Sequence, residues 1–499
     1  MLIQISFRSL IIILFCLFTL PVKAQFIATE QVFPVEGYSV FEAGYPVKIA
    51  PGTENKFVYL EFWAEGKEKR RIDNYYIQSY GIRDYVEHWF RPVTNEGFEP
   101  MEVKDLVRLE KSYAVIGLQF KEDDKTVHTV GRFYDLDGQS KTTEPVKISN
   151  FKKRPKKDYL EWLEVSPRTK YMVWMGQDFK KEINYVTVWN GDGDKVWEKE
   201  ITIPNLNENY RVNELKIDDR GEVYFLLEPD VPFLNRREKK PIIMLRYQAE
   251  KETFLTEVVH VDEEADIMKS HFAFLRGGDI VIAGVLSKDE EEGIKNGSKL
   301  GTEGITRNWT HLFLKRYTRD KDNRDILTIK ADSISAIPSG WIKQYEEEGS
   351  NFNLSELVVD EDYCALILEE HYKTKQKLYY YDLGCVGFDT KDGSVTWSRI
   401  INKRQRDSQS DAFMSYVSGV SRNRLRLVYL TERGAAGQLL CTSIEMKTGK
   451  RKDKMLASNE ATNYLFFPAR SGMVSNFEMV LIGMGNPTQN DYSLITISF

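Results

Sequence analysis

Phe388-Asp389-Thr390-Lys391-Asp392-Gly393-Ser394-Val395-Thr396-Trp397 has the pattern of a strand end, a tight turn of acidic residues and glycine, and the start of a returning strand that reaches a tryptophan. Weaker copies recur along the chain, and in some of them the turn glycine is missing. The copies with glycine are Tyr134–Gly138, Trp189–Gly193 and Ile444–Gly449; those without it lie near Arg83, Ala249 and Arg319. Recurrence of this kind indicates a repeat protein.

Short apolar runs alternate with polar turns, and no long segment keeps a helical period. The most regular runs occur once per repeat: Phe57–Leu60, Tyr113–Ile116, Tyr171–Trp174, Val223–Leu226, Ile280–Ala283, Cys364–Ile367, Leu425–Val428 and Phe477–Val480. Most are apolar at successive positions rather than at alternate ones, which is typical of strands covered on both faces. The sequence therefore predicts an all-β chain built from small sheets that stack on one another.

A repeat of about 40 to 60 residues with four short strands is the signature of a β-propeller. We predict a single propeller over residues 25–499 with eight blades of four antiparallel strands, or seven blades if the weak first repeat is only an N-terminal extension. The chain stops at Phe499 before a further acidic turn, so the last repeat lacks an outer strand. We expect the apolar segment Gln31–Val35 to supply this strand and close the ring, which leaves no unpaired edge there.

Three long segments depart from the repeat. Pro229–Pro241 and Ser287–Asn308 lie between the second and third strands of their units, and Ile334–Asn353 precedes the first strand of the sixth unit. In a propeller, both kinds of connection leave from the same face of the disc. Because long loops on a rigid scaffold usually carry binding, this face is the predicted binding face.

The run Gly387–Trp397 resembles the repeat of the pyrroloquinoline-quinone-like (quinoprotein-like) propeller superfamily, in which strand, Asp, Gly and Trp recur in that order. Asn190–Trp197 is a second, partial match, and Glu445–Lys450 keeps the acid and the Thr-Gly pair. The Asp is expected to accept hydrogen bonds from turn amides, the Gly to take a positive φ, and the Trp to pack between blades.

This resemblance implies eight blades and a superfamily that includes quinone-dependent dehydrogenases and non-enzymatic envelope assembly proteins. The chain lacks the adjacent Cys pair associated with quinone-dependent alcohol dehydrogenases. No set of cofactor ligands can be carried over residue by residue. The resemblance therefore favours a non-enzymatic member without a cofactor.

Residues 1–24 have the pattern of a secretory signal peptide, with Arg8, the apolar run Leu10–Leu20 and the cleavage site Val22-Lys23-Ala24. We expect cleavage before Gln25 and a protein that is exported, to the periplasm or outside the cell. A membrane-spanning helix needs roughly 20 apolar residues, and no segment approaches that length, so we expect no transmembrane segment in the mature chain.

The chain carries 69 basic and 75 acidic residues, and its formal net charge is −6. A mildly acidic surface of mixed charge gives no reason to expect a nucleic acid partner. The sequence makes no prediction of the oligomeric state.

Cys364, Cys385 and Cys441 remain after signal cleavage, which is too few for a scaffold built on disulfides. Cys364 and Cys385 flank a hairpin whose turn is expected near Thr374-Lys375, and this turn would place them about opposite each other on neighbouring strands. A disulfide is one alternative. Two buried, reduced thiols are the other and the favoured one.

The sequence singles out no catalytic, cofactor-binding or metal-ligating residue. Asn190–Asp194 begins like a calcium loop, but the sixth position is Lys195 and the twelfth is Ile201, so a hairpin turn is favoured. The glycine-rich segment Gly293–Gly304 lacks the ending of a phosphate loop, and no Gly-x-Ser-x-Gly elbow occurs. The histidines are scattered without metal-ligand spacing: His88, His128, His260, His271, His311 and His371.

Basic runs occur at Lys152–Lys157 and Arg236–Lys240. They would form an anion-binding patch if both lie on the long-loop face, although solvated loops are the favoured interpretation. Asn308-Trp309-Thr310 fits a glycosylation acceptor pattern.

Two functional hypotheses remain. The first, which we favour, is an exported, non-catalytic scaffold that binds a protein or glycan partner through the long loops on one face. The second is a propeller enzyme, either a quinoprotein-type oxidoreductase or a carbohydrate-active hydrolase or lyase, because propeller sites are assembled from single residues of many blades. A tight central pocket lined by several converging carboxylates or histidines would count strongly against the scaffold.

Overall fold

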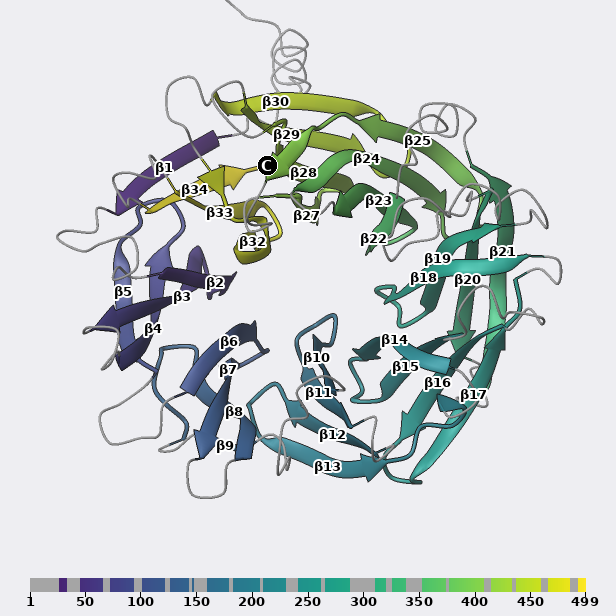
Figure 1. Ribbon diagram of the computed structural model, residues 1–499, viewed down its shortest axis with the longest axis horizontal. Coiled ribbons are helices and arrows are strands. Elements are labelled where there is room, and N and C mark those ends of the chain that lie inside the picture. Colours follow the sequence, from purple (N-terminus) through teal and green to yellow (C-terminus); the bar gives the residue numbers. More distant parts are fainter. Residues whose placement is uncertain are drawn as a thin grey trace, which may run out of the picture.

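The structure, a computed structural model, describes residues 27–33, 45–65, 72–93, 101–121, 126–142, 146–147, 159–178, 183–206, 210–229, 241–261, 265–287, 310–319, 325–337, 352–373, 377–407, 414–432, 437–458, 465–484 and 492–499. In these residues the chain forms eight antiparallel sheets arranged as blades around a ring (Figure 1). The predicted all-β propeller with eight blades is confirmed, and the alternative of seven blades is wrong.

Blades 1 to 4 have four strands each, which follow one another from the ring centre outward. They are β2 (Tyr45–Pro51), β3 (Lys56–Glu65), β4 (Ile72–Gly81) and β5 (Glu87–Pro92); β6 (Met101–Arg108), β7 (Ser112–Lys121), β8 (Thr126–Asp135) and β9 (Val146–Lys147); β10 (Tyr159–Val165), β11 (Tyr171–Asp178), β12 (Ile183–Asn190) and β13 (Lys195–Ile201); and β14 (Tyr210–Ile217), β15 (Val223–Pro229), β16 (Ile242–Gln248) and β17 (Thr253–Val259).

Blades 5 to 8 follow the same order, with additional short strands in blades 6 and 8. They are β18 (Asp266–Phe274), β19 (Ile280–Ser287), β20 (His311–Arg319) and β21 (Leu327–Ala336); β22 (Phe352–Val359), β23 (Tyr363–Lys373), β24 (Leu378–Asp389), β25 (Val395–Ile401) and the additional β26 (Gln405–Asp407); β27 (Tyr416–Ser421), β28 (Arg424–Leu430), β29 (Gln438–Glu445) and β30 (Arg451–Ser458); and β31 (Leu465–Phe466), β32 (Gly472–Ser475), β33 (Glu478–Met484), β34 (Tyr492–Ser498) and β1 (Ile27–Phe33), with a 3-10 turn at Pro468–Arg470.

The hydrophobic core lies between neighbouring blades. The layer between blades 3 and 4, for example, joins Val173 and Val188 of blade 3 to Leu215 and Phe225 of blade 4. Full burial of such a side chain contributes about 1.5–3 kcal/mol, so a blade gains its stability from its neighbours rather than alone. This arrangement explains why the predicted second strands are apolar at successive positions: every residue of β15 is buried.

The N-terminal strand closes the ring. β1 pairs with β34 in antiparallel register, from Ile27 opposite Ser498 to Phe33 opposite Tyr492, and the two strands lie side by side in Figure 1. The predicted closing segment, Gln31–Val35, overlaps the end of this strand. Its last two residues, Pro34 and Val35, lie outside the described residues.

The repeated turn has the local role that the sequence predicts. In blade 6, the Asp389 carboxylate accepts a 2.8 Å hydrogen bond from the backbone N–H of Lys391, and Gly393 has a φ of 80°. The indole N–H of Trp397 donates a 2.6 Å hydrogen bond to the carbonyl of Met446 in blade 7. The tryptophan therefore connects two blades, and the motif acts in the architecture of the ring.

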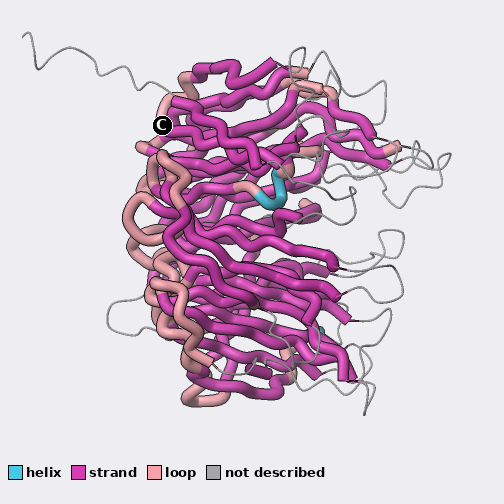
Figure 2. The backbone as a smooth tube through the Cα atoms, turned by 90° about the vertical axis from the view of Figure 1, so that its left-hand side faces the viewer, coloured by secondary structure: helices cyan, strands magenta, loops and turns pink. Residues whose placement is uncertain are grey.

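The two faces of the disc differ. We call the face that carries the connections from first to second and from third to fourth strands the turn face; these short turns form the pink edge in Figure 2. Because neighbouring strands are antiparallel, the other connections leave from the opposite, loop face. The three predicted long segments all begin and end there, at strands β15 and β16, β19 and β20, and β21 and β22. Their interiors lie outside the described residues.

The predicted pairing of Cys364 with Cys385 is wrong. Cys364 lies opposite Phe388, and Cys385 lies opposite Ile367, because the ladder between β23 and β24 is set three positions later and contains a bulge near Glu369. Together with Cys441, the two cysteines are free and buried, as the favoured alternative predicts. Burial raises the pKa of the Cys385 thiol to about 12, which keeps it protonated.

Within the described residues, no helix has the length and apolar character to cross a membrane.

Candidate functional site at the ring centre

Irregularities in the innermost strands place charged side chains near the middle of each strand. β-bulges interrupt β14, β18 and β22, and each bulge is followed directly by a charged residue: Glu214, Lys269 and Glu356. A bulge bends the strand and re-aims the side chains next to it. In blades 1 and 2 the corresponding bulges are followed by Lys48 and Asp105, which form a 3.0 Å ion pair.

Five charged or titratable side chains on β10, β14, β18 and β22 gather at the ring centre, and we call them the inner-strand cluster. All five are half-buried: Glu164, Glu214, Lys216, His271 and Glu356. They come from four consecutive blades, so the ring and not any single blade brings them together.

Glu214 ties blade 4 to blade 5. One carboxylate oxygen contacts Nδ1 of His271, and the other accepts a 2.8 Å hydrogen bond from the backbone N–H of Phe272. The second ring nitrogen of His271 lies 3.4 Å from the carbonyl of Leu354 in blade 6. Burial alone would raise the pKa of Glu214, but the contact with His271 and the nearby Lys216 ammonium outweigh burial and hold this pKa below its usual value.

Glu356 ties blade 6 to blade 7. Its carboxylate accepts a 2.6 Å hydrogen bond from the Ser418 hydroxyl, and a parallel contact joins the Tyr416 hydroxyl to Ser355 at 2.7 Å. Burial raises the pKa of Glu356, although the Ser418 hydrogen bond and the charges of His271 and Lys216 limit the rise. Glu356 therefore takes up a proton more readily than Glu214 does.

Glu164 and Lys216 differ from the rest of the cluster. Among the described residues, neither side chain has a hydrogen-bond or ion-pair partner, and they are not bonded to each other. Burial raises the pKa of Glu164, while Lys216 acts to lower it, so the two charges lie within electrostatic reach. The Lys216 ammonium lies 5.6 Å from the centre of the Phe272 ring.

The cluster can accept and donate hydrogen bonds and hold a proton. Three carboxylates outnumber the lysine, so its net charge is negative when His271 is neutral. In the part of the chain that the structure describes, no three His, Cys, Asp or Glu side chains come together as a possible metal site. What the cluster offers is an acceptor at Glu164 and a donor at Lys216.

A second polar group lies at the loop face, at the base of an extended hairpin in blade 6. The fully buried Lys403 ammonium donates a 2.6 Å hydrogen bond to Glu369, and the Ser415 hydroxyl donates to the same carboxylate at 2.8 Å. The backbone N–H of Lys403 donates to Asp382 at 3.0 Å, and its ammonium lies 5.6 Å from the Tyr380 ring centre. Burial lowers the pKa of Lys403. These contacts fasten β26 and the hairpin to blade 7.

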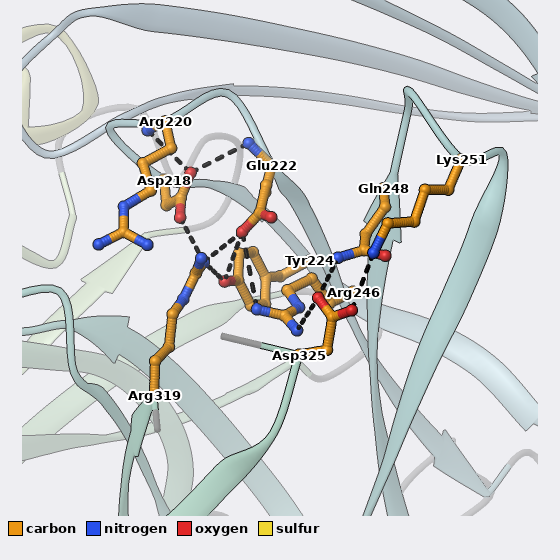
Figure 3. A network of polar contacts seen from close by, with 9 residues as sticks. All are labelled: Asp218, Arg220, Glu222, Tyr224, Arg246, Gln248, Lys251, Arg319 and Asp325. Carbon is orange, nitrogen blue, oxygen red and sulfur yellow. Dashed lines mark hydrogen bonds and ion pairs between the residues drawn. The ribbon is translucent and has the colours of Figure 1, made fainter. Parts of the chain in front are cut away.

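A third polar network joins blades 4 and 5 at the turn face (Figure 3). Arg319 of blade 5 forms a 2.6 Å ion pair with Asp218 and also contacts Glu222. Arg246, only 2% exposed, lies 3.8 Å from Glu222 and 3.7 Å from Asp325. Because acids and bases are paired across the blade boundary, this network holds the two blades together.

The motifs that the sequence analysis considered do not lie together in one site. Asn190–Asp194 is a hairpin turn, as predicted, with the Asn190 side chain accepting hydrogen bonds from the amides of Asp192 and Asp194. Of the histidines, His271 belongs to the inner-strand cluster, and His371 stacks on Tyr380 at the loop face with ring centres 5.3 Å apart. The two basic runs, the segment Gly293–Gly304 and Asn308 of the acceptor pattern lie outside the described residues.

The sequence analysis missed the whole inner-strand cluster. The members lie on four strands that give no motif, and apart from Glu214 and Lys216 they are far apart in the chain. One signal was available: Glu214 and Lys216 flank Leu215 in a first strand, so two charges share one face of a strand next to the ring axis. This pair of charges can be recognised as part of a site only when the order of the blades around the ring is known.

Comparisons with known proteins assign no family to this chain. Neither a protein-family model nor a curated protein matches the sequence. Similar solved structures include a prolyl endopeptidase (10% identity, TM-score 0.39, 89% of this chain and 53% of that one), the β-propeller domain of the Trilobed protease from Pyrococcus furiosus (11%, 0.35, 81% and 94%) and a protein of unknown function from Dyadobacter fermentans (11%, 0.33, 95% and 99%). The chain spans about half the length of the prolyl endopeptidase.

Proposed function

We propose that this protein is an exported, non-catalytic binding propeller that holds a protein or glycan partner at its loop face and ring centre. The observation that carries the proposal is the contrast between the faces. The turn face is closed by short capped turns and by paired charges, whereas the long connections begin at the loop face. Long loops on a rigid scaffold are where binding usually occurs.

The blade 6 hairpin supports the loop face as the binding face. β23 and β24 extend past the neighbouring strands, and β26 and the buried pair of Lys403 and Glu369 hold this extension in place. A buried ion pair contributes little net stability, but it specifies one geometry. The extension presents His371, which is exposed, on the half-buried Tyr380. Such rigid aromatic and polar groups are suited to contact a partner.

Kinship with the pyrroloquinoline-quinone-like repeat and export from the cell belong to the same proposal. The kinship is supported by the turn geometry of Asp389, Gly393 and Trp397, and export by the composition of residues 1–24. Sequencing the N-terminus of the natural protein tests export: a chain that starts at Gln25 supports it, and an intact Met1 in the cytoplasm contradicts it.

Binding to an array of glycans and to a lysate of the producing organism tests the main proposal. The wild type is compared with a loop-face variant, His371→Ala/Arg406→Glu, and with a matched turn-face variant, Lys391→Ala/Lys447→Glu; all four side chains are exposed. We expect saturable binding that the loop-face variant weakens and the turn-face variant keeps. Absence of any saturable binding, or loss with the turn-face variant alone, contradicts the proposal.

A carbohydrate-active hydrolase or lyase is the second candidate, and the inner-strand cluster favours it. The pKa of Glu214 is lowered while burial raises that of Glu164, and carboxyl groups pushed apart in this way are suited to separate base and acid roles. Incubating the protein with each bound glycan and analysing the products tests it. Product formation that Glu164→Gln abolishes establishes the enzyme, and an unchanged glycan leaves the binding function.

A further inference from the structure

We infer that the ring centre beside blades 3 and 4 binds a neutral carbohydrate through Glu164, Lys216 and Trp162. The inference rests on the proposed binding function and goes further by naming the ligand class and the contacts. It starts from the difference between two kinds of charged side chain in the inner-strand cluster.

Two members of the inner-strand cluster, Glu214 and Glu356, already form contacts that hold neighbouring blades together. Glu214 uses both carboxylate oxygens, on His271 and on the Phe272 amide, and Glu356 accepts from Ser418. These contacts cross blade boundaries, so they account for the presence of the two glutamates in the fold. Binding a ligand at either one would break a contact that holds the ring.

Glu164 and Lys216 have no such role. Glu164 offers only acceptors when it is ionised, and Lys216 offers only donors. Both are half-buried, so part of each charged side chain stays accessible to a ligand. They lie on the neighbouring inner strands β10 and β14, which pack against each other, but do not form an ion pair. A ligand that satisfies both must therefore donate and accept hydrogen bonds within a short distance.

Carbohydrate hydroxyls meet this requirement. Each hydroxyl donates one hydrogen bond and accepts others, so neighbouring hydroxyls on a sugar ring can serve Glu164 and Lys216 together. The negative net charge of the cluster disfavours an acidic sugar, because a further carboxylate would be repelled by Glu164, Glu214 and Glu356. The ligand class is therefore a neutral sugar.

Trp162 supplies an apolar face next to Glu164. It lies two residues before Glu164 on β10, so both side chains project from the same face of the strand, toward blade 4. Its indole is half-buried against the core between blades 3 and 4, and the rest of it stays accessible. An indole presents a flat apolar surface to a sugar ring, while the charged groups bond the hydroxyls.

Titration by saturation-transfer NMR and calorimetry tests the inference. The probes are neutral trisaccharides of glucose, mannose, galactose and N-acetylglucosamine. A sialylated trisaccharide and a mixture of unstructured peptides are tested as alternative ligands. The variants are Glu164→Gln, Lys216→Met and Trp162→Phe, and Glu102→Gln on β6 in blade 2 is the matched control. Circular dichroism and thermal unfolding check that each variant is folded.

We expect at least one neutral trisaccharide to bind, and each site variant to weaken it about tenfold or more while Glu102→Gln leaves it unchanged. The inference is overturned if no neutral sugar binds the folded wild type, if only the peptides or the sialylated sugar bind, or if folded site variants bind as well as the wild type. In these cases the loop-face experiment still decides the binding function separately, because it alters His371 and Arg406 and not the ring centre.

Discussion

Gly449 of blade 7 and Trp397 of blade 6 are in direct contact: a Cβ added to Gly449 would lie only 2.4 Å from the Cβ of Trp397. The same relation holds between Gly138 of blade 2 and Trp89 of blade 1, where the nearest indole atom would be 2.6 Å away. A turn glycine in one blade thus accepts a tryptophan from the outer strand of the blade before it. At Gly193 and Gly393 the nearest neighbours in the preceding blade are Phe133 and Ser333 instead, so the glycine–tryptophan contact is specific to the boundaries between blades 1 and 2 and between blades 6 and 7 among these four turns.

Gly449→Ala is therefore expected to destabilise the protein for two reasons. Gly449 has a φ of 66°, and the added methyl group would collide with Trp397. Gly278→Ala is the matched control, because Gly278 has a φ of 89° but has no atom within 4 Å of an added Cβ. Urea unfolding should show a loss of about 1–2 kcal/mol for the control and a clearly larger loss for Gly449→Ala. Equal losses would show that the contact with Trp397 has no energetic role.

The buried pair of Lys403 and Glu369 gives a second prediction. Lys403→Met leaves the Glu369 carboxylate buried without its cation, so we expect a loss of about 3–5 kcal/mol in the free energy of unfolding. Lys391→Met is the control, because Lys391 forms a 2.9 Å ion pair with Asp362 at the exposed turn face, where such pairs contribute about 0–1 kcal/mol. A loss for Lys403→Met as small as that of the control would mean that the pair does not hold the blade 6 hairpin.

Glu356 gives a prediction on pH dependence. Burial raises its pKa in the folded protein above the ordinary value of 4.5. Its contribution to stability is then fully present below the unfolded pKa and is lost as the pH rises through the folded pKa. Glutamine does not titrate. As the pH rises above the ordinary value of 4.5, the stability of the wild type should therefore fall relative to that of Glu356→Gln.

The measurement is urea unfolding of both proteins at several pH values, with Glu198→Gln on the outer strand β13 as the control. A difference between wild type and Glu356→Gln that stays constant with pH would show that the pKa of Glu356 is not raised.

Ring closure gives a prediction on the chain terminus. Deleting residues 25–35 removes the seven residue pairs between β1 and β34. Each ladder hydrogen bond contributes about 0.5–1.5 kcal/mol, so thermal unfolding should occur at a markedly lower temperature. A synthetic peptide of residues 25–36 should restore the temperature in a saturable way, and a scrambled peptide should not. An unchanged unfolding temperature would contradict closure by β1.

The ring could be predicted from the sequence because its determinants are local and repeated. Gly393 and Trp397 mark the turn and the docking strand in a single ten-residue stretch, and each copy reports one blade. The closing strand was also accessible, since the last repeat lacks an outer strand and an apolar segment near Gln31 was left over. The register between strands could not be predicted. The ladder between β23 and β24, with its bulge near Glu369, places Cys385 three positions away from the partner that the sequence predicts.

The candidate site could not be predicted for the opposite reason. Glu164, Lys216, His271 and Glu356 are spread over nearly 200 residues and are brought together only by the circular order of the blades. Along the chain, the residues around Glu164 do not distinguish it from Glu161, three residues earlier. In the structure, however, the Glu161 carboxylate accepts a 2.7 Å hydrogen bond from Thr129 in blade 2. Only the arrangement of neighbouring blades separates a paired carboxylate from one without a partner.

The most direct test of a binding propeller that acts through its ring centre is to map the bound state by difference hydrogen–deuterium exchange, with the neutral trisaccharide that binds best at saturating concentration. We predict slower exchange in 162–165 of β10 and 214–217 of β14, and no change at the turn face in 389–393 or 218–222. Protection confined to the turn face, or an exchange pattern that the sugar does not change at all, would contradict binding at the ring centre.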